Sequence, residues 1–382
     1  MRICLLGASG SIGKQTLDVM KKNREDFSLS SFAVGNRTRC ISNIIKHFPE
    51  VTHVYMIDSQ KAKYYAKRYP HISFYSGGDM NKLITESDNE MVVNALVGFS
   101  GLSPSICALE NNKLLALANK ESLVVGGEII NALLREEKGK LYPIDSEHSA
   151  IWKCLKVSDQ NVDKICLTAS GGAFRKLKID ELKDVKASDA LKHPTWKMGN
   201  KITIDCATMM NKAFELIEAY YLFGYKSKDL KVTLHDESYL HSYVSYKDGL
   251  FRGELSKPDM RNPIKFALYQ GNIPFKTQTF TSLDSLKGLH FHEFNPDRYP
   301  LVSLADLVIS KGGTYGAIIN ASNEVAVNAF LKDEIAFLDI DKIIRKSIKE
   351  MPYIAHPTLE EIFDIDKQTR AFATKLVKGG IK

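Results

Sequence analysis

The chain has 382 residues, which is too long for one ordinary hydrophobic core, so we expect two or three domains. Its 44% hydrophobic and 25% charged residues are ordinary for a globular protein, and no apolar run is long enough to cross a bilayer. The net charge of +7 suits an anionic substrate such as a phosphate ester, or only reflects a basic proteome, but the scattered Lys and Arg residues argue against a nucleic-acid partner.

The N-terminal segment has the pattern of a nucleotide-binding turn. Residues 2–6 predict a buried parallel strand, and an amphipathic helix follows the loop Gly7-Ala8-Ser9-Gly10-Ser11-Ile12-Gly13. A glycine-rich turn between a strand and a helix is the context in which a dinucleotide pyrophosphate lies on a helix N-terminus. We therefore predict a dinucleotide site here, the alternative being a glycine turn with a structural role only.

The next predicted strand, 29–34, bears on the choice of cofactor. It ends in Gly35-Asn36-Arg37-Thr38-Arg39. An NAD site would have an acidic residue here for the ribose hydroxyls, whereas an arginine accommodates the additional phosphate of NADP. The segment has two arginines and no acid, so NADP is favoured over NAD.

Further strands at 51–57, 91–96 and 114–117 continue the alternation with helices, one of which we predict at 59–69. The strand at 114–117 leads into Ala118-Asn119-Lys120-Glu121-Ser122, and polar residues at this end of a parallel strand lie where open sheets bind ligands. The alternative for Lys120 is a solvated loop lysine. Residues 1–144 are therefore expected to form an α/β dinucleotide-binding domain.

The segment 143–149, Pro-Ile-Asp-Ser-Glu-His-Ser, holds two carboxylates one residue apart. In an extended chain Asp145 and Glu147 would leave the backbone on the same side and could meet at one hard divalent cation, with Ser146 as a further oxygen donor. Most such pairs are solvated surface turns, so the motif alone is a weak signal.

A strand at 162–167 leads into a stretch of small residues, 168–174, whose backbone amides could form an anion site around Ser170; a plain turn is the alternative. The later segment 191–200 carries His193 and Trp196 in a charged stretch without helical or strand periodicity. We interpret it as a lid that closes over a ligand. A tryptophan that fills a surface hollow is the alternative, and a histidine alone is more often structural.

We predict a strand at 201–205 and, after it, a helix that begins near Asn211. Asn211, Glu215 and Glu218 share the polar face of that helix, with Lys212 nearby, while Phe214, Ile217 and Tyr221 form the buried face. A solvated charged face is the default interpretation. Glu215, however, is placed to add a third carboxylate to Asp145 and Glu147 at a Mg²⁺ or Mn²⁺ site.

The remaining chain predicts structure without obvious chemistry. Strands at 231–234, 242–246 and 250–255 suggest an antiparallel sheet that completes a catalytic domain, 145–269, and the aperiodic run 270–293 is interpreted as a linker. Residues 294–382 predict a helical domain, with apolar stripes in three helices and a capping box, Thr358 to Glu361, at the start of a fourth.

Six cysteines lie far apart and include no C-x-x-C pair: Cys4, Cys40, Cys107, Cys154, Cys166 and Cys206. This pattern favours reduced thiols over a disulfide framework or a structural zinc site. Together with the absence of a signal peptide or a membrane-spanning run, it predicts a cytoplasmic protein without a membrane partner.

Five ordered motifs resemble the 1-deoxy-D-xylulose 5-phosphate reductoisomerase family of the non-mevalonate isoprenoid pathway. They are residues 7–13, 118–122, 145–148, 193–196 and 207–212, and the similarity extends to Lys257-Pro-Asp-Met-Arg261 and the helical tail. The resemblance implies an N-terminal Rossmann-like dinucleotide-binding domain, a central α+β catalytic domain and a C-terminal helical bundle. It also implies a small phosphorylated sugar as substrate, and a homodimer is expected.

The resemblance carries the family's functional residues onto this sequence position by position. The metal, Mn²⁺ or Mg²⁺, would be held by Asp145, Glu147 and Glu215, which with Lys120 form the catalytic set. The substrate contacts would be Lys120, Ser146, Glu147, Ser170, His193, Trp196, Cys206, Asn211, Lys212 and Glu215. The NADPH contacts would be Ser9, Gly10, Ser11, Ile12, Gly35, Asn36, Arg37, Asn119, Glu121 and Gly199.

Two positions depart from the family pattern. Cys206 stands where the family usually has a phosphate-binding serine, and a thiol is a weaker donor than a hydroxyl. Asn36-Arg37 replaces the commoner lysine–asparagine pair near the 2′-phosphate.

The implied reaction begins with chelation of the substrate's ketone and adjacent hydroxyl by the metal. Fragmentation and recombination of the carbon skeleton then give a branched aldehyde phosphate, which NADPH reduces to 2-C-methyl-D-erythritol 4-phosphate. Lys120 would stabilise oxyanion charge, and His193 and Trp196 would exclude water. The rival interpretations are a metal-free semialdehyde-type dehydrogenase with Cys206 as nucleophile, and a non-catalytic NADP-sensing protein.

Overall fold

The computed structural model describes residues 1–191, 199–274, 282, 284 and 288–380. The chain divides into two compact units, each with its own core. The first contains Met1–Ser122, Ile129–Asp145 and the described part of Met260–Gln278, and the second contains Leu123–Glu128, Ser146–Asp259 and the described part of Thr279–Lys382.

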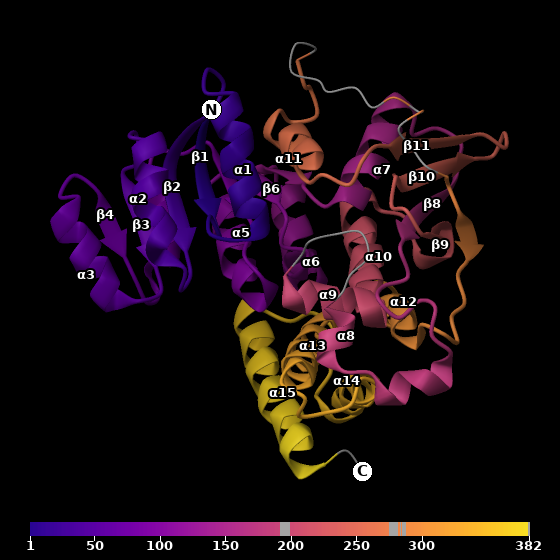
Figure 1. Ribbon diagram of the computed structural model, residues 1–382. Coiled ribbons are helices and arrows are strands. Elements are labelled where there is room, and N and C mark those ends of the chain that lie inside the picture. The colour runs from indigo at the N-terminus through magenta and orange to yellow at the C-terminus, as the bar shows by residue number, and fades with distance from the viewer. Residues whose placement is uncertain (192–198, 275–281, 283, 285–287, 381–382) are drawn as a thin grey trace. The chain divides into compact units, whose positions relative to one another are not determined.

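The first unit is built on a seven-stranded sheet in the order β4-β3-β2-β1-β5-β6-β7, in which all pairs are parallel (Figure 1). Its strands are β1 (Arg2–Leu6), β2 (Ser28–Val34), β3 (His53–Met56), β4 (Ser73–Tyr75), β5 (Met91–Asn94), β6 (Leu114–Leu117) and β7 (Lys140–Pro143). The order reverses beside β1, since the chain runs outward to β4 and then returns to β5. Such a switch point is where open α/β sheets bind ligands.

Helices connect these strands: α1 (Ser11–Lys22), α2 (Ile41–His47), α3 (Ser59–Arg68), α4 (Lys82–Thr85), α5 (Leu102–Glu110) and α6 (Glu121–Arg135). From later in the chain, α11 (Arg261–Leu268) packs on α1. The strands are nearly continuous apolar runs because a parallel sheet covered by helices is buried on both faces. Leu5, Phe32 and Val54 are fully buried in this core. The predicted alternation is confirmed, although the sequence interpretation missed the short strands β4 and β7.

The second unit contains a five-stranded sheet in the order β11-β10-β8-β9-β12. Its strands are β8 (Val162–Ala169), β9 (Leu230–His235), β10 (Leu240–Tyr246), β11 (Phe251–Leu255) and β12 (Phe291–Glu293). β8 and β9 are parallel, whereas the other pairs are antiparallel, so the expected antiparallel pairing holds except between β8 and β9, and the sheet is mixed. β12 lies in the stretch 270–293 that we expected to be a linker.

Before its C-terminal part, the described residues of this unit form four helices: α7 (Ser146–Val157), α8 (Ala187–Ala190), α9 (Asn200–Thr208) and α10 (Met210–Phe223). The expected strand at 201–205 is therefore wrong, because these residues belong to α9. The alternation of Ile202, Thr203 and Ile204 suggested a strand. In the helix, Thr203, Ile204 and Ala207 are buried, and this packing outweighs the local β preference.

The C-terminal part is helical, as predicted: α12 (Leu304–Lys311), α13 (Tyr315–Leu331), α14 (Asp339–Glu350) and α15 (Leu359–Gly379). These helices, orange to yellow in Figure 1, form a bundle in which α13 packs against both α14 and α15. The predicted capping box is confirmed: Thr358 accepts a hydrogen bond from the Glu361 N–H, and the Glu361 carboxylate accepts one from the Thr358 N–H. Short 3-10 turns are Thr38–Cys40, Asp79–Asn81, Gly98–Gly101, Ile179–Asp184, Ser227–Asp229 and Pro300–Ser303.

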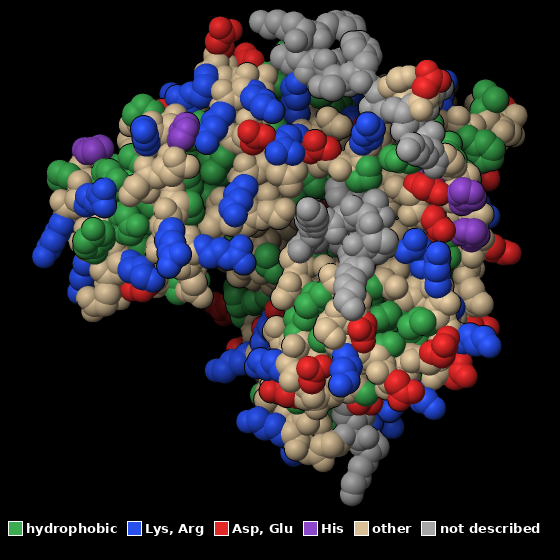
Figure 2. All heavy atoms as spheres, in the orientation of Figure 1, with side chains coloured by type: hydrophobic (Ala, Val, Ile, Leu, Met, Phe, Trp, Pro, Cys, Tyr) green, Lys and Arg blue, Asp and Glu red, His purple; other side chains and the backbone are tan. Residues whose placement is uncertain are grey.

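The surface carries both signs of charge. Lys and Arg side chains are interspersed with Asp and Glu on the face seen in Figure 2. Among the described helices, none is both long and apolar enough to cross a membrane. The expected domain boundaries at 144, 269 and 293 stay predictions.

Candidate active site

The glycine-rich turn after β1 has the form that its sequence predicts. Gly7 has a φ of +84°, and a Cβ there would overlap the Ala95 carbonyl group. A Cβ at Gly13 would lie 2.7 Å from the Ala8 Cα, so only glycine allows α1 to approach the turn this closely. α1 begins at Ser11, and Gly10 at its N-cap has no side chain to cap the helix. The N–H groups of that first turn are donors of the kind that bind a pyrophosphate.

The segment that follows β2 lies at the neighbouring strand end. β1 and β2 are paired in parallel, so Gly35 and Asn36 follow a strand that ends beside the glycine turn. Asn36, Arg37 and Arg39 are exposed. Two guanidinium groups next to a dinucleotide turn fit the recognition of a phosphorylated ribose.

A buried hydrogen-bond network fixes the loop after β6. The Asn119 amide nitrogen donates to the carbonyl groups of Leu96, at 3.1 Å, and Gly98, at 2.9 Å, and to the Glu121 carboxylate. Its amide oxygen accepts hydrogen bonds from the N–H and the hydroxyl of Ser122. The loop that contains Lys120 is therefore held rigidly.

Lys120 and Asp145 form an ion pair with Nζ and Oδ2 2.7 Å apart, and their side chains are only 9% and 12% exposed. Lys120 follows β6 and Asp145 follows β7, and these two strands pair in parallel. The sheet thus brings together two residues that the sequence analysis had assigned to the catalytic set. The alternative of a solvated loop lysine does not hold for Lys120.

Two further carboxylates meet at Lys212 in the second unit. Lys212 Nζ lies 3.0 Å from Glu147 Oε1, and it also contacts the Glu215 carboxylate. Burial by itself would lower the pKa of Lys212, but Glu147 and Glu215 outweigh burial and raise it. The Glu215 carboxylate also accepts a hydrogen bond from the Asn211 amide, and Glu147 accepts one from the Ser146 hydroxyl.

This arrangement corrects two local expectations. Glu147 lies in the first turn of α7 rather than in an extended segment, because the helix begins at Ser146 directly after Asp145. The face of α10 that carries Asn211, Glu215 and Glu218 is buried, not solvated. A buried face with two carboxylates is costly unless cations compensate the charge, so a functional reason for these residues gains weight.

In the second unit, Glu147 and Glu215 offer donors of the type that a hard divalent cation binds. Asp145, Glu147 and Glu215 are all carboxylates, and each of them is paired with a lysine ammonium group, Lys120 or Lys212. Carboxylate oxygens are the ligands that Mg²⁺ and Mn²⁺ prefer. The ammonium group of Lys212 supplies, next to Glu147 and Glu215, positive charge of the kind that such an ion would also supply.

The expected phosphate-binding segments also come together. Gly172, with a φ of +75°, packs so closely on α9 that a Cβ there would lie 2.7 Å from the Ala207 Cα and would overlap the Cys206 carbonyl. Lys212 Nζ donates a hydrogen bond of 2.5 Å to the Thr168 carbonyl at the end of β8. The loop around Ser170 is thus in contact with α9 and tied to α10.

Gly199 is exposed at the N-cap of α9. His193 and Trp196, the expected lid residues, lie outside the described residues. Their predicted roles stay predictions.

Comparison with known proteins gives the chain a family. A family model described as 1-deoxy-D-xylulose 5-phosphate reductoisomerase matches residues 3–127, and two models of the C-terminal domains of that enzyme match residues 141–223 and 255–372. The reductoisomerase of Bacillus cereus strain AH187 is 41% identical over 378 residues, which cover 98% of this chain and 99% of that protein. The chain belongs to the 1-deoxy-D-xylulose 5-phosphate reductoisomerase family. The Listeria innocua member is 38% identical over 380 residues, covering 98% of this chain and 100% of its own length.

Solved structures of the reductoisomerase family have the same fold. One, crystallised with NADPH, fosmidomycin and magnesium, aligns with a TM-score of 0.91 at 30% identity and covers 99% of this chain and 98% of its own. The Zymomonas mobilis reductoisomerase in complex with NADPH aligns with a TM-score of 0.89 at 32% identity over the same shares of the two chains. The expected fold, with a Rossmann-like domain, a central α+β domain and a helical bundle, is confirmed.

The sequence analysis assigned no functional role to His148 or Glu218, two buried residues beside the carboxylates. His148 is fully buried on α7; its Nε2 lies 2.9 Å from the Glu215 carbonyl oxygen, and its Nδ1 lies 3.5 Å from a Glu218 carboxylate oxygen. His148 therefore ties α7 to α10 next to Glu147 and Glu215. The position of His148 directly after Glu147 was the available signal, but a histidine in a short motif does not reveal a contact with a residue 67 positions later.

Proposed function

We propose that this member of the reductoisomerase family converts 1-deoxy-D-xylulose 5-phosphate to 2-C-methyl-D-erythritol 4-phosphate, with NADPH as hydride donor and Mn²⁺ or Mg²⁺ as metal. The observation that carries the proposal is the pair of carboxylates, the buried Glu215 and the partly exposed Glu147, that converge on one buried positive charge. Full-length similarity to curated reductoisomerases supports the same activity.

The chain would hold NADPH with the turn after β1, the segment after β2 and the loop after β6. The pyrophosphate would lie at the N-terminus of α1, and Arg37 would face the 2′-phosphate. The proposed contacts are Ser9, Gly10, Ser11, Ile12, Gly35, Asn36, Arg37, Asn119, Glu121 and Gly199. Bound NADPH supplies the hydride for the reductive half of the reaction.

The metal ligands would be Asp145, Glu147 and Glu215. A bound Mn²⁺ or Mg²⁺ supplies Lewis-acid polarisation of the substrate's oxygens. Around it, Lys120 would donate to the oxygen on which negative charge develops, which a buried ammonium can do without reorganising solvent. The network of Asn119 keeps the backbone beside Lys120 fixed for that task.

The substrate phosphate would be held by the loop around Ser170 together with Asn211 and Lys212 on α10. Ser170, α9 and α10 are tied together by the Gly172 contact and by the Lys212 hydrogen bond to Thr168, which supports this assignment. Cys206 would be a weaker donor in the same group. Ser146, His193 and Trp196 complete the proposed substrate contacts, the last two as lid residues.

We also propose that the enzyme is a cytoplasmic homodimer. β11 is an edge strand of its sheet, and Phe251 and the preceding Leu250 are 70% and 61% exposed. An edge strand with exposed apolar side chains suits pairing with a second copy. Sedimentation of wild type and Phe251→Asp would test the dimer.

None of the six cysteines, all of which are described, forms a disulfide, which suits a reducing compartment.

The activity is tested by NADPH oxidation on addition of 1-deoxy-D-xylulose 5-phosphate, with and without Mn²⁺. We expect turnover that a chelator abolishes and added Mn²⁺ restores. A metal-free dehydrogenase with Cys206 as nucleophile would instead be insensitive to chelators and inactivated by alkylation. A non-catalytic NADP-sensing protein would bind NADPH and turn over nothing.

A further inference from the structure

Helix α9 connects several of the proposed substrate contacts and one proposed NADPH contact, Gly199. Gly199 is its N-cap, and Gly172 of the Ser170 loop packs on its backbone at Cys206 and Ala207. α9 ends at Met209, which has a φ of +60°, and α10 begins at the next residue. A displacement of α9 would therefore move Cys206, the Ser170 loop and the start of α10 together.

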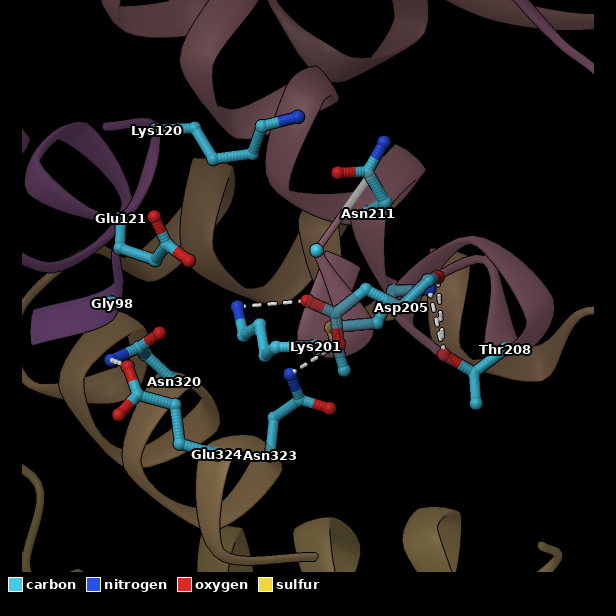
Figure 3. Close-up of polar contacts among 12 residues, drawn as sticks. Gly98, Lys120, Glu121, Lys201, Asp205, Thr208, Asn211, Asn320, Asn323 and Glu324 are labelled. Carbon is cyan, nitrogen blue, oxygen red and sulfur yellow. Dashed lines mark hydrogen bonds and ion pairs between the residues drawn. The ribbon is translucent and has the colours of Figure 1, made fainter. Parts of the chain in front are cut away.

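Asp205 anchors this helix on the side of the C-terminal bundle. It is 1% exposed, and its carboxylate lies between two donors (Figure 3). Lys201 Nζ is 2.8 Å from Oδ2, one turn earlier on α9, and the Asn323 amide nitrogen donates to Oδ1 at 2.9 Å from α13. The Thr208 hydroxyl donates to the Asp205 carbonyl at 3.2 Å and accepts from the Met210 N–H, which fixes the junction between α9 and α10.

The contact with Asn323 has a cost that packing alone does not explain. Asn323 is fully buried, and because its amide nitrogen faces Asp205, its amide oxygen points away and has no hydrogen-bond partner among the described residues. A buried acceptor without a partner lowers stability and calls for a reason. The hydrogen bond from Asn323 to Asp205 gives such a reason if it holds α9 in the position that the site requires.

We propose that Asp205 and Asn323 are positioning residues that hold α9 so that Cys206, Ser170 and the start of α10 meet the substrate phosphate. The inference rests on the proposed function, and it gives the C-terminal bundle a role in substrate binding. Asn323 connects α13 to Asp205 of α9. The next residue, Glu324, accepts a hydrogen bond of 2.8 Å from Arg370 of α15.

The test is an exchange of the two partners. Asn323→Asp places two carboxylates against each other, and Asp205→Asn places two amides together. The double variant Asp205→Asn/Asn323→Asp restores one amide–carboxylate hydrogen bond with the roles reversed. Glu324→Gln is the matched control, since it removes the charge of the next residue on α13, which pairs with Arg370 of α15. KM for 1-deoxy-D-xylulose 5-phosphate, KM for NADPH, kcat and Tm are measured for each.

We expect Asn323→Asp to raise the KM for the phosphorylated sugar about tenfold, the order seen when residues that orient ligands are changed. The KM for NADPH should change less, because Gly199, the proposed NADPH contact on α9, lies at the other end of the helix from Asp205 and Cys206. The double variant should recover most of the loss, as coupled residues do in a double-mutant cycle. Glu324→Gln should lower Tm without changing the KM for the sugar.

The proposal fails if folded Asn323→Asp binds the sugar normally, if the double variant recovers nothing, or if Glu324→Gln raises this KM equally. If Asn323→Asp does not fold, Asn323→Ala takes its place, and an unchanged sugar KM again overturns the proposal. Failure of the proposed function is distinct, because wild type itself would then not oxidise NADPH with this substrate.

Discussion

The ammonium group of Lys212 lies 3.0 Å from Glu147 Oε1 and also contacts Glu215, so one buried cation joins carboxylates from α7 and α10. Lys212 is 3% exposed and Glu215 is 1% exposed. A buried charge is tolerated only with a close partner of opposite sign. The three side chains are therefore interdependent, and two predictions follow from removing one of them at a time.

Glu215→Gln should fold and bind NADPH as wild type does but lose turnover by about two to three orders of magnitude, because several kcal/mol of transition-state stabilisation by the metal depend on its ligands. The Asn211 amide can still donate to the glutamine oxygen, which preserves the local helix. Steady-state kinetics with saturating Mn²⁺ measure the loss. Glu254→Gln, a carboxylate that pairs with Lys153 instead, is the control. Near-normal turnover of Glu215→Gln would remove Glu215 from the metal site.

Lys212→Met should destabilise the metal-free protein by about 3 kcal/mol, because Glu147 and Glu215 lose the cation between them. Mn²⁺ should then raise Tm more in this variant than in wild type, since the ion replaces the missing charge. Thermal unfolding with and without Mn²⁺ checks both effects. The control is Lys153→Met, which removes a lysine that pairs with Glu254. In this variant Mn²⁺ should raise Tm by the same amount as in wild type. Identical responses in Lys212→Met and wild type would contradict a metal at these carboxylates.

Local sequence signals were enough for the dinucleotide-binding part. The strand at 2–6, its glycine turn and the helix after it are specified by neighbouring residues. Because paired parallel strands end at the same edge of a sheet, Lys120 and Asp145 meet at the ends of β6 and β7. The strand expected at 201–205 was wrong for the opposite reason. Its three consecutive β-branched residues lie in a helix whose burial depends on packing against distant segments, including α13.

The burial of the α10 carboxylates was also beyond local reasoning. Lys212 and Glu147 are 65 positions apart, and His148 and Glu215 are 67 apart. The periodicity of α10 shows that Asn211, Glu215 and Glu218 share a face, but what covers that face depends on how α7 and β8 pack on it. The resemblance to a family supplied the roles of these residues, and the structure supplied the contacts between them.

NADPH should be strongly preferred over NADH, and Arg37→Ala should narrow the preference. A hydrogen bond to a charged group contributes about 1.5–3 kcal/mol, so we expect the kcat/KM for NADPH to fall by about 10- to 100-fold while that for NADH hardly changes. Arg39→Ala, measured in parallel, shows which of the two exposed arginines faces the phosphate. Arg68→Ala, on α3, is the control. Equal catalytic efficiency of wild type with both cofactors would exclude the predicted 2′-phosphate contact.

The attachment of β12 to its sheet should depend on pH. His290 Nδ1 lies 2.5 Å from Glu237 Oε1, and the His290 N–H donates to the same carboxylate at 3.1 Å. The hydrogen bond that His290 donates to Glu237, together with the charges of Glu237 and Asp236, raises the pKa of His290 above 6.5. Burial alone would raise the pKa of Glu237, but the side-chain and backbone hydrogen bonds that His290 donates lower it below 4.5.

The directions of these two pKa shifts define a pH range in which the His290–Glu237 ion pair stabilises the attachment of β12. The contribution of His290 is lost as the pH rises through its raised pKa, and that of Glu237 is lost as the pH falls through its lowered pKa. Hydrogen exchange at β12 in wild type and His290→Ala should therefore differ most between these two pKa values and converge at higher and lower pH. A difference that persists unchanged above the pKa of His290 would show that the ion pair does not anchor β12.

Cys206→Ser should preserve activity and lower the KM for 1-deoxy-D-xylulose 5-phosphate modestly. A hydroxyl that donates to a charged phosphate contributes about 1.5–3 kcal/mol when the geometry is good, and the thiol already supplies part of that, so we expect the lower end or less. Cys206 is half-buried on α9, beside the contact with Gly172 of the Ser170 loop. If Ser170, Asn211 and Lys212 hold the phosphate alone, the serine variant changes neither KM nor kcat. If Cys206 is a nucleophile, the variant folds but is inactive, and that result would overturn the metal-dependent assignment.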